Sequence, residues 1–398
     1  MRHVPFLLAL AVVTLITACT SNSLSPTAAE QPSDQDLKWL DQKEAEAERR
    51  IAEHEATILN HPNYLESAGK TASPTVYLQA GSVDGLQAAV DQAGPYGKVV
   101  VKPGLHIENQ TVNITHPVRI IGESGAIIQS NVAPTVDFSG FPAIPPTFTP
   151  SIFIDGADYV RIINLTFVPN PTLGYGELAI GINESEYAYI RGNTFQDFDC
   201  AVFSRKADYV LVLRNTAEGV ASDGLGAFGL GFLHASGSSP SYVKNTLNDF
   251  AIAQFYCDMN GLGCQNTGSN SYDNMILCKW PTVFSQFPNG DLVAADTTAV
   301  DWLVASNQAN SCAVGYRVTD GATNNLLINN NATNSTFYDA LFRTDIQDPL
   351  LGLLPAAFGN TFDSRRYPGL LVKDCGDNNT IIAATLVDTA VDTCGTDI

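Results

Sequence analysis

The chain has 398 residues, of which 16% are charged, and carries 41 Asp and Glu against 21 Lys and Arg, a formal net charge of −20. This acidic balance argues against nucleic acid and anionic lipid as partners, because both require clustered Lys and Arg. It is compatible with Ca²⁺, with a cationic or neutral ligand, or simply with solubility.

Residues 1–18 are predicted to be a targeting segment. Arg2 precedes the apolar run FLLALAVVTLI, which is too short for a membrane span. The run ends in ITAC, which resembles the bacterial lipobox. The resemblance implies cleavage before Cys19, acylation of Cys19 and membrane attachment through that lipid only. Thr20 stands where an Asp favours inner-membrane retention, so the resemblance points to the outer membrane. The alternative is an ordinary secretory signal with an unrelated cysteine.

Residues 19–32 are small, polar and Pro-containing, which is typical of a flexible tether. Residues 33–60 predict one amphipathic helix that packs on the body or forms a weak coiled coil, and its apolar positions near heptad spacing are Leu37, Leu40, Ala47, Ile51 and Ile58. His54 has no partner motif beside it and is expected in solvent. Residues 61–75 are predicted to be a linker.

From residue 76 onwards the pattern changes to short aliphatic strands. VDGLQAAVDQAG (83–94) predicts a short helix, and 98–129 predicts strands separated by Pro-Gly, Asn and Gly turns. This stretch resembles the entry of right-handed parallel β-helices of the pectin-lyase-like superfamily, in which a short helix caps the open end of the coil. The resemblance implies an all-β fold, with a right-handed parallel β-helix over 76–398.

A recurring asparagine at the end of aromatic and β-branched runs supports this fold. The anchors recur about every 20 to 35 residues, as in solenoid coils, and they are Asn164, Asn193, Asn215, Asn245, Asn274, Asn307 and Asn330. Asn tolerates the bends between strands, and stacked amides can hydrogen-bond from coil to coil. We therefore predict a structural asparagine ladder.

Without Cys19 seven cysteines remain, so at least one thiol is unpaired. Cys257 and Cys264 flank a loop within one predicted coil, and Cys375 and Cys394 flank the last strand pair. We predict both pairs to be disulfides. Aligned on the anchors, Cys278 is predicted to adjoin Cys312 in the neighbouring coil, close to disulfide distance. Cys200 is left over and is expected to be free and buried.

The chain lacks the catalytic signatures of polygalacturonase-like, pectate-lyase-like, pectin-esterase-like and mannuronan-epimerase-like branches, so its catalytic residues are unknown. A polar segment follows each copied motif, and stacking would place one strip of charges on an outer face: Arg205, Asp208, Asp258, Arg317, Asp320, Arg343 and Asp345. Such a strip would suit uronate or sugar binding, or acid–base chemistry. The alternative is ordinary turn chemistry on a solvated face. DMNG at 258–261 matches only the opening of a Ca²⁺ loop, so no cofactor is otherwise expected.

These observations predict an exported, lipid-anchored cell-envelope protein whose β-helix binds a polysaccharide or another extended envelope ligand. Membrane contact is expected through the lipid anchor only, and no nucleic acid is expected. One alternative is a polysaccharide lyase, hydrolase or epimerase with an atypical Arg/Asp site. Others are a scaffold or adhesin that uses the inserted loops at 130–153 and 218–232, or an accessory periplasmic β-helix protein.

Overall fold

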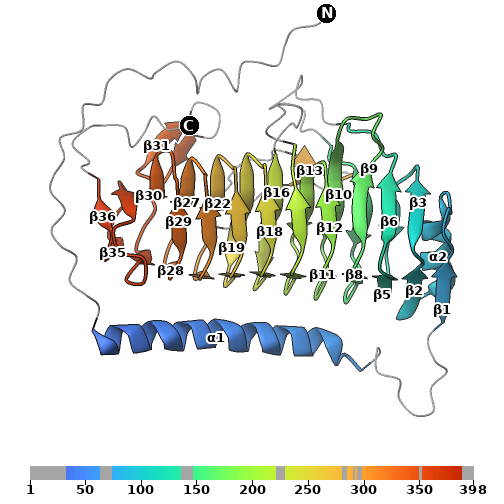
Figure 1. Ribbon diagram of the computed structural model, residues 1–398, viewed down its shortest axis with the longest axis horizontal. Coiled ribbons are helices and arrows are strands. Elements are labelled where there is room, and N and C mark those ends of the chain that lie inside the picture. The colour runs from blue at the N-terminus through green and yellow to red at the C-terminus, as the bar shows by residue number, and fades with distance from the viewer. Residues whose placement is uncertain are drawn as a thin grey trace, which may run out of the picture.

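The computed structural model describes residues 33–62, 74–135, 147–220, 229–279, 285–289, 292–293, 298–348 and 352–387. The predicted targeting segment, the tether and Cys19 lie outside these residues. Three long parallel sheets stack along one axis, and a single long helix runs beside them (Figure 1). Each turn of the chain visits the three sheets in the same order, which makes the fold a parallel β-helix, and crossovers between parallel strands of one sheet are right-handed.

The 12-stranded sheet begins each coil. In spatial order it contains β1 (Thr75–Leu78), β2 (Gly97–Val101), β5 (Val118–Gly122), β8 (Arg161–Ile163), β11 (Tyr189–Arg191), β14 (Leu211–Leu213), β17 (Ser241–Val243), β20 (Leu262–Cys264), β25 (Leu303–Ala305), β28 (Leu326–Ile328), β33 (Thr361–Asp363) and β35 (Thr380–Ile382). Its middle residues, such as Ile162 and Ile190, point into the solenoid and stack in register from coil to coil.

The 9-stranded sheet follows in each coil. It contains β3 (Gly104–Glu108), β6 (Ala126–Ser130), β9 (Thr166–Pro169), β12 (Thr194–Gln196), β15 (Thr216–Glu218), β18 (Thr246–Asn248), β21 (Thr267–Ser269), β26 (Gln308–Asn310) and β29 (Asn331–Thr333). From β12 onwards the middle residue of each strand is buried in the solenoid, whereas the two flanking residues face outwards. This alternation is what a half-buried strand requires.

The 11-stranded sheet completes each coil. It contains β4 (Val112–Ile114), β7 (Pro150–Asp155), β10 (Gly176–Asn183), β13 (Phe198–Arg205), β16 (Leu230–Ser238), β19 (Ile252–Met259), β22 (Asp273–Leu277), β27 (Val314–Val318), β30 (Tyr338–Phe342), β34 (Leu371–Asp374) and β36 (Thr385–Leu386). Two short antiparallel hairpins project from the coils: β23 (Ser285–Gln286) with β24 (Leu292–Val293), and β31 (Ile346–Asp348) with β32 (Gly352–Leu354).

The first open end of the solenoid is closed by α2 (Gly85–Ala93), as the sequence predicts. Leu86, Ala89, Val90 and Ala93 are buried in the main core. The Glu108 carboxylate accepts a hydrogen bond from the Leu86 backbone N–H at 3.0 Å, and so satisfies a donor at the helix N-terminus.

An asparagine ladder runs along the end of the 12-stranded sheet. Each side-chain oxygen accepts from the backbone N–H of the preceding member, at 2.8–3.0 Å, in the order Asn193, Asn215, Asn245, Asn266, Asn307 and Asn330. The sequence alignment therefore needs two corrections. Asn164 takes a left-handed bend position (φ 57°) just before the ladder, and Asn274 lies in β22 of the 11-stranded sheet. Asn266 holds the rung that was assigned to Asn274.

A second, shorter ladder lies at the other end of the same sheet, where it was not predicted. Asn325 Nδ2 donates to Asn360 Oδ1 at 2.9 Å, and Asn360 Nδ2 donates to Asn379 Oδ1 at 3.0 Å. The backbone N–H of Trp302 donates to Asn325 Oδ1, which extends this series of hydrogen bonds by one coil. The last coils therefore contain two sets of stacked amides.

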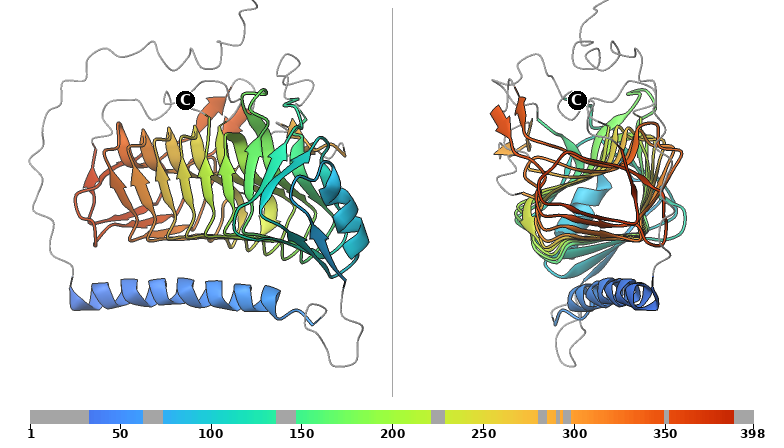
Figure 2. Two further views of the ribbon diagram at one scale, coloured as in Figure 1. Left: turned by 45° about the vertical axis from the view of Figure 1, so that its right-hand side comes forward. Right: turned by 90° about the vertical axis from the view of Figure 1, so that its left-hand side faces the viewer.

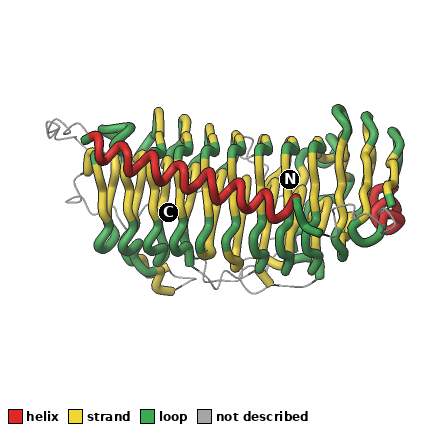
Figure 3. The backbone as a smooth tube through the Cα atoms, turned by 90° about the horizontal axis from the view of Figure 1, so that it is seen from below, coloured by secondary structure: helices red, strands yellow, loops and turns green. Residues whose placement is uncertain are grey.

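Helix α1 (Asp34–Leu59) lies across the outer face of the 12-stranded sheet (Figures 2 and 3). Leu40, Ala47, Ile51 and Ile58 are buried against residues of that sheet such as Leu211. Twenty-six residues extend about 39 Å, which matches the span of about eight strands. Of the two predicted alternatives, packing on the body is the one observed.

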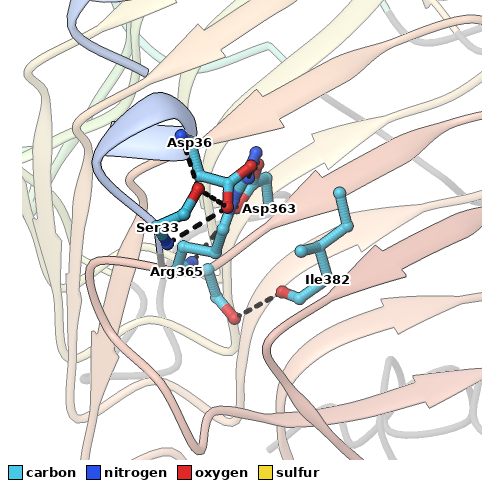
Figure 4. A network of polar contacts seen from close by, with 6 residues as sticks. Ser33, Asp36, Asp363, Arg365 and Ile382 are labelled. Atoms are coloured by element: carbon cyan, nitrogen blue, oxygen red, sulfur yellow. Dashed lines mark hydrogen bonds and ion pairs between the residues drawn. The ribbon is translucent and has the colours of Figure 1, made fainter. Parts of the chain in front are cut away.

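Polar contacts hold both ends and the middle of α1 on the sheet. At its start Arg365 lies between Asp36 of α1 and Asp363 of the last coils, where its Nη2 is 2.5 Å from Asp363 Oδ2 (Figure 4). At its end Arg161 Nη2 donates to the Ile58 carbonyl at 2.5 Å. His54, which was expected in solvent, instead contacts Ser241 Oγ at 3.1 Å, and burial lowers its pKa.

Two of the predicted cysteine contacts are wrong. Cys257 and Cys264 are not bonded to each other, because β19 and β20 belong to different sheets and the two side chains lie in different apolar clusters. Cys278 lies beside Cys257 and not beside Cys312, since Cys312 packs in the main core. Cys200 is free and buried, and burial raises the pKa of its thiol. Cys394 lies outside the described residues, so its bond to Cys375 stays a prediction.

Candidate ligand-binding face

The three predicted arginines all lie on the outer side of the 11-stranded sheet, but they are not an exposed strip. Arg205, Arg317 and Arg343 are only 5%, 6% and 7% exposed. Arg317 lies on β27, and Arg343 directly follows the neighbouring strand β30. Arg205 lies on β13, four strands away from β27. Arg205 Nη1 donates to Asn183 Oδ1 at 2.6 Å.

A cationic patch, which we define as Asp273, Arg317, Arg343 and Lys373, occupies the C-terminal part of this face. Arg317 Nε lies 3.0 Å from Asp273 Oδ1, and both side chains are buried. Burial raises the pKa of Asp273, against the opposing effect of the two arginines. Lys373 lies on β34 in the same register row as Arg317. The sequence reasoning missed Asp273 and Lys373, because neither follows a copied motif.

The predicted carboxylates do not converge on these cations. Asp208 accepts from Ser238 Oγ at 2.8 Å, Asp320 accepts from Thr319 Oγ1 at 2.8 Å, and Asp345 accepts from the Ala356 backbone N–H at 2.5 Å. Each therefore stabilises local structure near a strand end. Asp258 does not face outwards, because its side chain is fully buried and contacts His234 of the solenoid interior.

The solenoid interior contains a serine–histidine–aspartate series. Ser204 Oγ lies 2.5 Å from His234 Nδ1, and His234 Nε2 lies 3.1 Å from Asp258 Oδ2. The residue types are those of a nucleophilic triad. All three side chains have no exposed surface, however, and the Tyr242 hydroxyl lies 3.0 Å from Ser204 Oγ. A substrate cannot reach this series in the folded protein, so it serves as an internal polar network.

A pair of carboxylates is stacked between β10 and β13. Glu177 and Asp199 are register neighbours and are 2% and 0% exposed. Glu177 accepts from the backbone N–H groups of Thr135 and Thr149, and Asp199 accepts from that of Gly229. Burial raises the pKa of Glu177 to about 7. Both carboxylates are thus bound to backbone segments that border the inserted loops.

The outer side of the 9-stranded sheet differs from the other two faces because it is open. Five threonines form a threonine row, one per strand in parallel register: Thr166, Thr194, Thr216, Thr246 and Thr267. Thr216 and Thr246 are exposed, and the other three are half-buried. Among the described residues their hydroxyls have no hydrogen-bond partner, so they remain available to a ligand.

A second row runs parallel to the threonine row, two residues further along each strand. We call it the amide row, and it consists of Gln196, Glu218, Asn248, Ser269, Asn310 and Thr333. Its members hydrogen-bond along the axis: Asn248 Nδ2 donates to Glu218 Oε1, and Ser269 Oγ donates to Asn248 Oδ1, both at 2.8 Å. Neighbouring strands lie about 4.8 Å apart, so both rows repeat at that interval.

The signal for the threonine row is present in the sequence. An Asn-Thr dipeptide occurs at 193–194, 215–216, 245–246 and 266–267, and in each of these the asparagine belongs to the first ladder and the threonine points outwards, because successive side chains of a strand alternate. The same dipeptide at 360–361 and 379–380 begins strands of the 12-stranded sheet. The dipeptide therefore indicates this face only where its asparagine is a rung of the first ladder.

In the described part of the chain no group of three or more His, Cys, Asp and Glu side chains is arranged to hold a metal ion. A hollow beside α2 is lined by Asp84, Asp91 and Glu108, but Glu108 is bonded to the helix N-terminus. Within the described ranges no helix has both the length and the apolar character needed to cross a membrane.

The chain matches no described protein family and no curated protein. Several solved structures align with it at low sequence identity. The catalytic domain of a GH87 α-1,3-glucanase, in complex with tetrasaccharides, aligns at 12% identity over 83% of this chain and 68% of that one, with a TM-score of 0.47. Polygalacturonase from Erwinia carotovora ssp. carotovora aligns at 11% identity over 81% and 99%, with a TM-score of 0.47.

The surface adhesin PfbA of Streptococcus pneumoniae aligns at 11% identity over 76% of this chain and 88% of that one, with a TM-score of 0.42. Identities at this level concern the fold and not the activity. The three parallel sheets and the capping helix by themselves identify the fold as a parallel β-helix.

Proposed function

We propose that the protein binds an extended polysaccharide along the outer face of the 9-stranded sheet. The observation that carries this proposal is the threonine row, which offers an available hydroxyl on each of five successive strands. The amide row beside it adds donors and acceptors in the same register. A polymer of identical sugar units presents hydroxyl groups at regular intervals, so a face with a regular repeat can bind several units in the same way.

The charge of this face favours a neutral polysaccharide. From β9 to β29 the outward side chains include only one charged residue, Glu218, although the chain as a whole is acidic. At the first end of the sheet the threonine row continues into the apolar side chains of Ile127 and Leu105. Apolar contacts next to hydroxyl and amide groups suit the mixed surface of a sugar ring.

A second candidate ligand is an acidic polysaccharide at the cationic patch. The proximity of Arg317, Arg343 and Asp273 favours it, because guanidinium groups bind carboxylates in bidentate geometry. Tyr272 and Phe337 at the edge of the patch are 37% and 53% exposed and would be available for stacking on sugar rings. Since the arginines are nearly covered, such a ligand would insert single carboxylates and not a whole chain.

Two experiments distinguish binding on the threonine row from binding at the cationic patch. One changes the charge of the polysaccharide, and the other substitutes residues of the threonine row. A retention assay compares a neutral glucan with polygalacturonate at low and high salt. Binding on the threonine row should retain the neutral glucan with little salt dependence, whereas binding at the cationic patch should retain polygalacturonate and weaken with salt. The double substitution T216Y and T246Y should abolish retention of the neutral glucan without unfolding the protein, because Tyr suits an exposed strand position.

The matched control is R49Y, which places tyrosine on the exposed side of α1, where Arg49 pairs with Glu53 of the same helix. Retention unchanged by T216Y and T246Y would refute the threonine row as the binding face. Failure of every glycan to bind would refute polysaccharide binding altogether.

Export and lipid anchoring belong to the same proposal. The lipobox-like ITAC stretch supports acylation of Cys19, and the location proposed is the cell envelope, with the outer membrane as the favoured membrane. Mass spectrometry of the mature N-terminal peptide tests this part by itself. A peptide that starts at Cys19 and carries acyl chains is expected, and an unmodified N-terminus at another residue would contradict the anchor but not the binding face.

A further inference from the structure

Two cysteines from successive coils meet on the outer side of the 11-stranded sheet. The register of β19 and β22 pairs Tyr256 with Leu277, which places Cys257 opposite Cys278. The two sulfur atoms are 2.6 Å apart, and both side chains are fully buried. They lie in one apolar cluster with Phe255 and Ile276.

We infer that Cys257 and Cys278 form a disulfide that joins two successive coils of the solenoid. Strands of one sheet lie about 4.8 Å apart, within the range of Cα separations that disulfides span. Both side chains point to the same face, so neither strand has to move for the bond to form. The bond would close a loop of 21 residues that contains β20 and β21.

The reaction is an exchange with an external disulfide of the glutathione or thiol-oxidoreductase class. One thiolate attacks the external disulfide and forms a mixed disulfide, and the second thiolate then displaces the remaining external thiol. Overall two thiols lose two protons and two electrons and form one S–S bond, while the external disulfide is reduced to two thiols. Such oxidants are present where exported proteins fold.

None of the other described free cysteines is placed to compete for either partner. Cys200 occupies the opposite end of its strand, in register with Leu230 and Leu178. Cys264 lies under α1 on the 12-stranded sheet, and Cys312 lies in the main core. The structure therefore favours a bond between Cys257 and Cys278, whereas the sequence predicted a bond between Cys257 and Cys264.

Burial determines when the bond forms. Burial and the adjacent Cys257 thiol raise the pKa of Cys278, and the attacking species is the thiolate. A folded, reduced protein should therefore oxidise slowly, and the bond should form while the coils are still assembling. Once formed, the same burial should protect the bond from reductants.

The test is to refold the full chain in reduced and oxidised glutathione, alkylate it in denaturant without reduction, and digest it for mass spectrometry. The expected products are a linked pair of peptides that contain Cys257 and Cys278 and, as predicted from the sequence, a second pair that contains Cys375 and Cys394, with Cys200, Cys264 and Cys312 alkylated. Dithiothreitol should break the link much faster in denaturant than in buffer. Substitution C312S is the control and should leave the link intact.

Two results would overturn the inference. One is recovery of Cys257 and Cys278 as separate alkylated peptides after oxidative refolding, and the other is a bond from either of them to another cysteine. The measurement uses wild-type protein and an added oxidant, so its outcome is independent of the proposed export and of glycan binding.

Discussion

The asparagine ladder makes the most quantitative prediction, at its central rung. Asn245 Oδ1 accepts from the backbone N–H and from Nδ2 of Asn215, at 2.9 and 3.1 Å. Asn245 Nδ2 donates to the Val212 carbonyl at 2.9 Å and to Asn266 Oδ1 at 3.0 Å. The substitution N245A removes all four hydrogen bonds inside a buried environment.

Two of the four partners keep another hydrogen bond after the substitution. Asn215 Nδ2 still donates to the Ile190 carbonyl, and Asn266 Oδ1 still accepts from the backbone N–H of residue 245. The Asn215 backbone N–H and the Val212 carbonyl lose the contacts described above. An unsatisfied buried group costs about 1–3 kcal/mol, so N245A should lower the free energy of unfolding by about 2–6 kcal/mol.

Asn274 provides a matched control, because it is also fully buried and lies outside the ladder. Neither polar atom of its side chain has a hydrogen-bond partner in the described part of the chain. The substitution N274A should therefore change the free energy of unfolding by no more than about 1 kcal/mol, since it removes an unsatisfied amide and leaves a small cavity. Urea unfolding monitored by circular dichroism measures both. Equal losses for N245A and N274A would refute the assignment of rungs.

Three further predictions concern charged groups. Burial raises the pKa of Glu177 to about 7 from an ordinary 4.5. Its contribution to the free energy of unfolding is therefore greatest below pH 4.5 and is lost as the pH rises to 7. About 3 kcal/mol of pH dependence in that window should disappear in E177Q, and an unchanged pH profile of unfolding would contradict the assignment. R317A should destabilise by about 3 kcal/mol, because it leaves Asp273 buried without its 3.0 Å partner; a urea midpoint equal to wild type would show that the pair is not structural. Glu44 accepts from Ser306 Oγ at 2.5 Å and Asn329 Nδ2 at 2.9 Å, so E44A should speed proteolysis of α1, with E53A as an exposed control.

The fold was predictable because its signals are local and repeated. The asparagine that ends each short strand, the helix before the first strands and the heptad-like apolar spacing of α1 each follow from residues a few positions apart. The positions at which the alignment failed are those where a coil departs from the common length. The rung from Asn245 to Asn266 spans 21 residues and the next spans 41, which exceeds the common coil length, so the alignment took Asn274 instead of Asn266.

That error of alignment explains the errors at the cysteines and in the charged strip. With Asn274 as a rung, Cys278 aligned with Cys312, whereas the register of the sheet places it opposite Cys257. The predicted strip also assumed that polar residues after each copied motif all point outwards, but Asp258 points into the solenoid. Burial of the arginines depends on segments distant in the sequence, which a local pattern does not reveal.

The most direct test of the proposed function is a crystal structure of the protein soaked with the neutral oligosaccharide that it retains most strongly. The threonine row predicts an extended sugar chain over β12, β15, β18 and β21, with successive sugar units contacting Thr194, Thr216, Thr246 and Thr267. An ordered sugar on the outer side of the 11-stranded sheet would instead favour the cationic patch. A threonine row that stays empty at saturating oligosaccharide would contradict the proposed binding face.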